Sequence, residues 1–328
     1  MNFMTTGIGS LPHINIDSAL AYSFRHDIPF LPQLPIYNKN EYMVYQALSH
    51  LPGIQKPENG ISLIDLKAWV KERQSFLKRA KKAKLNSDYS SFLPDKDAFS
   101  ALQAFYFEAE NKKTKLIKLQ ICGPFTAVQS LKLLDHSPAK DFPDLVNDIL
   151  LHIELSIKAL VQKFSQLDSR ILFFFDEPAL VIYSSYHGLQ YRLFERILKG
   201  ARYLQEQNIQ VGLHCCANIL WEQVLAYPQL FNYISFDVNA SFHSLMELKE
   251  ELRYYTKQSQ FSFGLIPTNW SKLNIYNEKL PDIINCLKLK QTSTHLITAA
   301  CGLAHQSIEV SEEIASCLIK EKKTALNI

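Results

Sequence analysis

Residues 170–178 read RILFFFDEP, an apolar run that ends in two carboxylates and a proline. Such an uninterrupted run of aliphatic and aromatic residues predicts a strand buried on both faces, as in a parallel sheet covered by helices. Seven further segments share this plan, a short apolar run that closes on a polar or special residue: TTGIGSLP (5–12), IPFLPQLP (28–35), LIKLQICGP (116–124), IQVGLHCC (209–216), YISFDVN (233–239), FSFGLIPT (261–268) and HLITAACG (295–302). The chain is therefore expected to build its core from eight parallel strands.

Stretches with helical spacing separate these segments. PFTAVQSLKLL (124–134) and FPDLVNDILLHIELSIKALVQKF (142–164) have apolar residues at about every third or fourth position. The same spacing recurs over 187–207, 244–257 and 280–289. Strand alternating with helix eight times is the signature of a (β/α)₈ TIM barrel. We predict a single α/β barrel domain over residues 1–328.

One connection is much longer than the others. The insertion of about 37–114, between the second and third predicted strands, includes LKAWVKERQSFLKRAKKAKL (66–85), with eight Lys and Arg residues. This helix is either an anion-binding surface or a solvated helix with a thin apolar stripe. Loops after barrel strands face the active site, so the insertion is also a candidate lid.

Composition limits the classes of function. The chain is 47% hydrophobic and 20% charged, with a net charge of +3 that favours neither a nucleic-acid nor a membrane partner. The start of the sequence lacks a secretory signal pattern, and no apolar run has the length of a membrane span. A cytoplasmic protein is expected, whose six cysteines stay reduced and serve as thiols or metal ligands.

Polar residues gather at the ends of the predicted strands. In a TIM barrel the active site lies at the C-terminal ends of the strands, so these side chains are expected to meet at one mouth. They are Ser10, Gln33, Asp176, Glu177, His214, Cys216, Asp237 and Cys301.

Three of these residues form a candidate metal site. His214 and Cys216 are two apart on a predicted strand and so share a face, whereas Cys215 points towards the helices as a packing residue. Cys301 ends the last strand, and Gly302 gives the chain room to turn there. One imidazole and two thiolates suit Zn²⁺, with a fourth position for a carboxylate, water or substrate. The remaining cysteines are interpreted as packing residues: Cys122, Cys286 and Cys317.

The carboxylates allow more than one interpretation. Asp176 and Glu177 either cap the next helix along the chain or face the mouth, where one of them pairs with a substrate ammonium group. Asp237 is a fourth metal ligand, a hydrogen-bond partner of His214 or a structural residue.

Four motifs together resemble a known family. Ile8-Gly9-Ser10-Leu11-Pro12 resembles the opening of the catalytic barrel of cobalamin-independent methionine synthase, and Asp176-Glu177-Pro178-Ala179 resembles its DEPA segment. His214-Cys215-Cys216 fits its His-x-Cys zinc pair, and Cys301-Gly302-Leu303 fits its final Cys-Gly-Leu. The order along the chain is that of the family. The closest resemblance is to short, one-barrel members of the uroporphyrinogen decarboxylase and methionine synthase-like superfamily.

The resemblance implies a zinc ion that binds the thiolate of homocysteine and transfer of a methyl group to its sulfur, which gives methionine. It assigns Ile8 and Ser10 to the carboxylate end of the amino acid and Asp176 to its ammonium group, with Glu41 as a weaker second ammonium partner. The family's fourth zinc ligand is Glu, and the nearest counterpart here is the shorter Asp237.

The methyl donor has two alternatives. The family's large enzymes bind polyglutamyl folate with the help of a second, N-terminal barrel, which these 328 residues do not contain. His214-Cys215-Cys216-Ala217-Asn218 is also similar to the zinc site of methyltransferases that act on corrinoid proteins and coenzyme M. A methylated corrinoid carrier protein is therefore the alternative donor to folate.

Two other functions compete with a thiol methyltransferase. One is a non-catalytic barrel with a structural zinc, which would be closed by four protein ligands. The other is a decarboxylase of the uroporphyrinogen type, but the arginine-rich N-terminal motif of that family is absent here.

Overall fold

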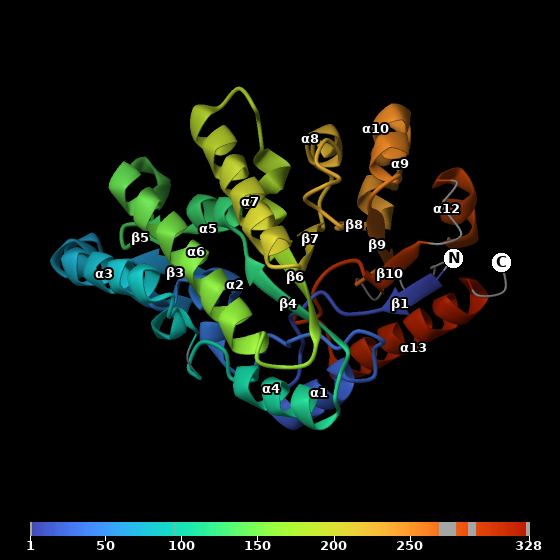
Figure 1. Cartoon of the computed structure of the whole chain (residues 1–328), viewed down its shortest axis with the longest axis horizontal. Coiled ribbons are helices and arrows are strands. Elements are labelled where there is room, and N and C mark those ends of the chain that lie inside the picture. The colour runs from blue at the N-terminus through green and yellow to red at the C-terminus, as the bar shows by residue number, and fades with distance from the viewer. Residues whose placement is uncertain (1, 95, 269–279, 288–292, 326–328) are drawn as a thin grey trace.

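A parallel sheet of seven strands forms the centre of the computed structural model, which describes residues 2–94, 96–268, 280–287 and 293–325 (Figure 1). The strands are β1 (Asn2–Thr5), β4 (Leu116–Cys122), β6 (Arg170–Asp176), β7 (Gln210–Cys215), β8 (Tyr233–Asp237), β9 (Gln260–Ile266) and β10 (Thr294–Ala299). Their order is β1-β10-β9-β8-β7-β6-β4, and every neighbouring pair is parallel. The last six predicted strands are thus confirmed to within a few residues.

The first two predicted strands differ from expectation. The first strand was predicted at 5–12 but lies earlier, at Asn2–Thr5. The chain continues without regular structure through Gly7 and Gly9. The segment predicted at 28–35 is not a continuous strand. It contains three prolines, which have no N–H group to donate to a sheet.

Residues 28–33 nevertheless lie between the two edge strands of the sheet. The amide of Ile28 donates to the carbonyl of Thr5 at 3.1 Å, next to β1. On the other side, Lys118 of β4 donates its amide to Pro29 at 2.8 Å and accepts from Leu31 at 2.9 Å. The structure therefore confirms an α/β fold with a curled parallel sheet, which has seven continuous strands within the described residues where eight were predicted, and a closed TIM barrel remains a prediction.

Alternation along β6 divides the core into two parts. Ile171, Phe173 and Phe175 join the large apolar cluster that lies between the sheet and the helices. Leu172 and Phe174 belong to a second cluster inside the curl, completed by Ile28, Tyr233 and Leu296 from other segments. Residues from across the sheet contact one another there because the sheet curls around them.

The helices alternate with the strands along the chain. They are α1 (Ile16–Ser23), α5 (Pro124–Ser130), α6 (Pro143–Phe164), α7 (Gly188–Glu206), α8 (Trp221–Leu225), α9 (Val238–Glu247), α10 (Lys249–Tyr255), α12 (Leu280–Leu287) and α13 (Ile308–Ala325), with 3₁₀ turns η3 (Ala139–Asp141) and η4 (Pro178–Ile182). The helix predicted at 124–134 ends at Ser130, and β5 (Lys132–Leu133) follows it. The helix predicted at 244–257 is divided between α9 and α10.

The long insertion contains both helices and strands. Its elements are η1 (Lys39–Glu41), α2 (Met43–Leu48), β2 (Ile54–Glu58), β3 (Ile61–Ile64), α3 (Leu66–Asn86), η2 (Ser90–Phe92) and α4 (Leu102–Asn111). Strands β2 and β3 form a three-stranded sheet with β5. The basic helix α3 packs on α6, where Asp148 accepts from Trp69 at 3.1 Å and from Arg73 at 2.8 Å. The role of the whole insertion as a lid remains a prediction.

No described helix combines the length and the apolar composition needed to cross a bilayer.

Candidate metal centre

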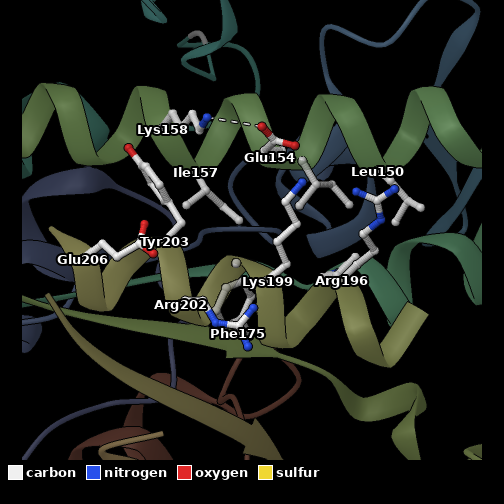
Figure 2. A pocket seen from close by; sticks show the side chains of 13 residues that line it. Leu150, Glu154, Ile157, Lys158, Phe175, Arg196, Lys199, Arg202, Tyr203 and Glu206 are labelled. Carbon is white, nitrogen blue, oxygen red and sulfur yellow. Dashed lines mark ion pairs between the residues drawn. The ribbon is translucent and has the colours of Figure 1, made fainter. Parts of the chain in front are cut away.

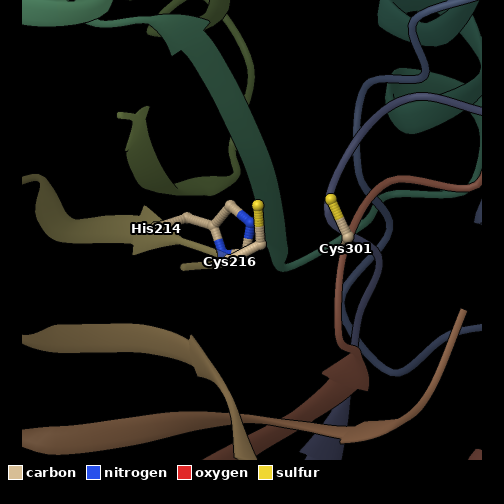
Figure 3. A group of neighbouring side chains, drawn as sticks. All are labelled: His214, Cys216 and Cys301. Atoms are coloured by element: carbon tan, nitrogen blue, oxygen red, sulfur yellow. The ribbon is translucent and has the colours of Figure 1, made fainter. Parts of the chain in front are cut away.

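His214, Cys216 and Cys301 come together as the sequence predicts. Their ligand atoms all lie within 4.8 Å of one another, and they are the one group of three or more potential ligands that meets this criterion among the described residues. Figure 3 shows His214 and Cys216 at the end of β7 and Cys301 on the segment after β10. His214 is buried, whereas the residues Cys216 and Cys301 are partly exposed.

The alternation predicted for residues 214–216 is confirmed. Cys215 is fully buried within the apolar cluster beneath the helices, on the opposite face from His214 and Cys216. Burial raises the pKa of the Cys215 thiol to about 12, so this thiol stays protonated. The packing role predicted for Cys122 also fits its near-complete burial, whereas the side chain of Cys286 lies outside the described residues.

The two thiols of the site shift each other's pKa in opposite directions. Hydrogen bonds from Cys301 and from His214 lower the pKa of Cys216 below its ordinary value, and the same contact with Cys216 raises the pKa of Cys301. One sulfur is therefore ready to bind a cation as a thiolate, and the cation would displace the proton from the other.

Cys301 is held against the N-terminal motif. The amide of Leu303 donates to the carbonyl of Ser10 at 2.8 Å, and a Cβ atom on Gly302 would lie 2.1 Å from Ser10 Oγ. Glycine at this position therefore leaves room for the hydroxyl group of Ser10. Ile8, Ser10 and Cys301 line one small cavity, so the structure brings these predicted site residues together.

Ser235 contacts His214, and this contact was not predicted from the sequence. Its hydroxyl lies 3.0 Å from His214 Nδ1, and the two residues are paired in register between β7 and β8. This contact orients the ring and leaves Nε2 available for a metal. The signal was present in YISFDVN, because alternation places Ser235 and Asp237 on the same face.

If His214 ligates a metal, Ser235→Ala is expected to weaken binding of that metal, tested with Zn²⁺, about tenfold to a hundredfold, because loss of a hydrogen bond behind a ligating histidine has that effect. Competition with a chromophoric chelator measures the zinc affinity. Ser262→Ala is the matched control, since Ser262 is buried and pairs with Ser235 in register on β9. Equal zinc affinities in the two variants would contradict the orienting role.

Asp176 lies beside the metal-site residues with an unsatisfied oxygen. It is paired in register with His214 and is only 6% exposed, yet its Oδ1 has no hydrogen-bond partner among the described residues. Burial raises the pKa of Asp176 to about 6, against the opposing effects of Lys118 and His214. A buried carboxylate oxygen without a partner is costly, so this position favours a cationic or hydrogen-donating ligand.

Lys118 and Gln120 are two further residues that the sequence analysis did not select. Lys118 Nζ donates to the carbonyl of Ile8 at 2.7 Å and to Gln120 Oε1 at 3.1 Å, and Gln120 in turn donates to the carbonyl of Leu31. Two side chains of β4 thereby bind the segment that contains Ile8 and the segment that contains Leu31. Burial lowers the pKa of Lys118 to about 8, and its charge offsets that of Asp176. The sequence did contain an indication of this role, because a lysine inside the apolar predicted strand LIKLQIC needs a polar partner.

Glu177 makes its contacts with a helix rather than with the metal site. Its carboxylate accepts from the amides of Phe125 at 3.0 Å and Thr126 at 2.7 Å, at the N-terminus of α5. A Cβ atom on Gly123 would lie 2.1 Å from Glu177 Oε1, so the glycine makes room for this cap. The sequence predicted a cap on the next helix, whereas Glu177 caps α5, which precedes β6 in the chain, and a contact with substrate remains a prediction.

Asp237 and Glu41 have structural contacts of their own. Asp237 caps α9 by accepting from the amide of Asn239 at 2.8 Å. It is outside the group of three ligands, and ligation of a metal by it stays a prediction. Glu41 accepts from the amides of Leu34 and Ser100, both at 2.8 Å, and from the hydroxyl of Ser100. Both of its carboxylate oxygens are therefore occupied.

Comparison with known proteins finds likenesses among solved structures but none in sequence. No family model matches the sequence, and no curated protein matches it. A methyltransferase from Methanosarcina mazei has a similar structure, with a TM-score of 0.45 and 11% sequence identity over 71% of this chain. The match spans 66% of that protein's chain. What the site does has to follow from the residues of this chain.

Proposed function

We propose that this protein is a zinc-dependent methyltransferase that transfers a methyl group to the thiol of homocysteine, within a TIM-barrel mouth. The observation that carries the proposal is the convergence of one imidazole and two thiols beside an unpaired buried carboxylate oxygen, that of Asp176. Three protein ligands with an open fourth position are typical of catalytic zinc.

The residues fit zinc in type and in spacing. Zinc–ligand bonds of about 2.0–2.3 Å place the ligand atoms of a tetrahedral site about 3.5–3.8 Å apart. The three atoms here already lie within 4.8 Å, so only a small contraction is needed. The soft donor set also favours zinc over magnesium or calcium, which prefer oxygen ligands. When bound, zinc supplies a substrate thiol that is deprotonated at neutral pH.

The protein residues would bind and orient the acceptor. The thiolates of Cys216 and Cys301 cancel the formal charge of a divalent metal, so the substrate sulfur keeps its nucleophilic character. Asp176 has the free oxygen and the burial to pair with the ammonium group of an amino acid. Ser10, next to Cys301 in the same cavity, is assigned to the carboxylate end by the motif resemblance. Holding acceptor and donor in line lowers the entropic barrier.

The donor is proposed to be either a methylfolate or a methylated corrinoid carrier protein. Residues on the segment after β6 are exposed although they are apolar, with Val181 54%, Ile182 51% and Tyr186 99% exposed. Segments that follow barrel strands surround the mouth, so these side chains would contact a large donor. Their exposure gives support to a carrier protein as the donor.

Formation of methionine tests the proposal. Zinc-loaded protein and homocysteine are incubated separately with methylcobalamin, methyltetrahydrofolate and its polyglutamate, with Cys216→Ser as the inactive control. Methionine formed by the parent protein alone is the expected result. Absence of methionine with every donor would reject homocysteine methylation.

Zinc X-ray absorption distinguishes catalytic from structural zinc. Addition of homocysteine is expected to increase the number of sulfur ligands from two to three. A spectrum that homocysteine leaves unchanged, with four protein ligands, would support a non-catalytic zinc barrel instead.

A further inference from the structure

A second cavity lies outside the curled sheet, between α6 and α7 (Figure 2). Its volume is about 300 Å³. Phe175, at its base, belongs to the outer face of β6, whereas the metal-site residues belong to the inner face. This cavity, here called the α6–α7 groove, is therefore separate from the metal site.

The groove is open beside Gly200, a residue of α7 that has no side chain. A Cβ atom on Gly200 would already lie 3.0 Å from the ring of Phe175, so a larger residue at this position would fill the space. Ile153 and Ile157 form the wall on α6, and Tyr203 forms part of the wall on α7. The groove thus has apolar and aromatic walls suited to a small organic group.

Positive charge exceeds negative charge around the groove. Four basic residues and two acidic residues line it: Lys158, Arg196, Lys199, Arg202, Glu154 and Glu206. Glu154 has an ion pair with Lys158 at 3.2 Å and another with Lys84 of α3 at 3.4 Å. Together with Lys199, these two lysines lower the pKa of Glu154 although burial opposes them. One carboxylate is therefore shared by three ammonium groups.

Three of the basic residues lack an ion-pair partner within the described chain: Arg196, Lys199 and Arg202. Figure 2 shows Arg196 and Lys199 extending from α7 towards α6. Lys199 shares the charge of Glu154 with two other lysines, so positive charge stays in excess beside Arg196, and a bound anion would reduce the resulting repulsion. A guanidinium group beside an ammonium group suits phosphate oxygens, because the guanidinium can donate two parallel hydrogen bonds.

We propose that the α6–α7 groove binds an organic phosphate monoester whose phosphate contacts Arg196 and Lys199 and whose apolar group lies beside Gly200. The juxtaposition of unpaired cations with an open apolar channel carries this inference. It is independent of the proposed methyl transfer, since no residue of the groove belongs to the metal site.

Calorimetric titration of the zinc-loaded protein with phenyl phosphate tests the proposal. Phenyl phosphate is expected to bind at least about tenfold more tightly than phenol or inorganic phosphate, because only the ester uses both the cations and the apolar walls. Benzoate tests the alternative that any aromatic anion is accepted. Binding of phenyl phosphate no tighter than that of benzoate or inorganic phosphate would overturn the assignment of a phosphate ester.

Variants locate the site. The double variant Arg196→Gln/Lys199→Gln is expected to weaken binding about tenfold. Arg192→Gln is the matched control, a loss of charge one turn earlier on α7 and outside the groove, and it should leave binding unchanged. Gly200→Leu should abolish binding by filling the channel. Equal affinities in the parent and the double variant, or loss of binding in Cys216→Ser, would place the ligand elsewhere and overturn the proposal.

Discussion

The parent protein is expected to hold about one zinc ion per chain, and Cys216→Ser and Cys301→Ser are each expected to lose it. A serine hydroxyl remains protonated and neutral at pH 7, so each change removes a thiolate and one negative charge from the site. Zinc affinity spread over three protein ligands amounts to several kcal/mol per ligand, so a loss on the order of a thousandfold is expected.

Elemental analysis of desalted protein and competition with a chromophoric chelator measure this effect. Cys215→Ala is the matched control, because Cys215 lies between the ligand positions but is fully buried on the opposite face. This variant is expected to keep its zinc even if it is less stable. Zinc that stays with Cys216→Ser, or that is lost equally from a folded Cys215→Ala, would show that the metal binds elsewhere.

The positions of the three candidate metal ligands could be predicted from the sequence because two simple rules determine them. Alternation places His214 and Cys216 on one face of β7, and parallel strands bring their carboxyl ends to one edge, where Cys301 follows β10. Neither rule depends on details of side-chain packing. The same alternation identified Cys215 as a core residue.

Contacts that depend on neighbouring strands were not predicted. Ser235 reaches His214 only because β7 and β8 pair in one particular register, and Lys118 reaches Ile8 only because residues 28–33 lie against β4. Register is a property of the assembled sheet and is not written in either strand alone. The second predicted strand failed for a different reason, since three prolines prevent regular pairing in a segment that still occupies the expected position.

The structure also explains why two adjacent carboxylates differ. Asp176 ends β6 on its inner face, beside His214 and with one oxygen unpaired, while Glu177 follows with its carboxylate on the α5 N-terminus. The sequence offered capping and substrate binding as alternatives for both residues. The contacts in the structure show capping by Glu177 and leave Asp176 with one oxygen free for the substrate contact that we propose, and a single substitution tests the role of Glu177.

Glu177→Ala is expected to destabilise the fold by about 3 kcal/mol. It leaves the amides of Phe125 and Thr126 buried without an acceptor, and each such group costs about 1–3 kcal/mol. For a chain of 328 residues this corresponds to a fall of about 4 °C in the thermal midpoint. Differential scanning calorimetry of the zinc-free proteins measures the change without a contribution from metal binding.

Glu177→Gln provides the graded control. Its amide oxygen can accept from one of the two N–H groups, whereas its NH₂ group opposes the other, so about half of the loss is expected. Zinc affinity should be unaffected in both variants, because Glu177 contributes no ligand atom to the group of three. A thermal midpoint that stays at the parent value, together with weaker homocysteine binding, would instead assign Glu177 to the substrate. Because capping acts on the folded state and substrate binding acts only on the complex, measuring both quantities on the same variants decides between the two roles.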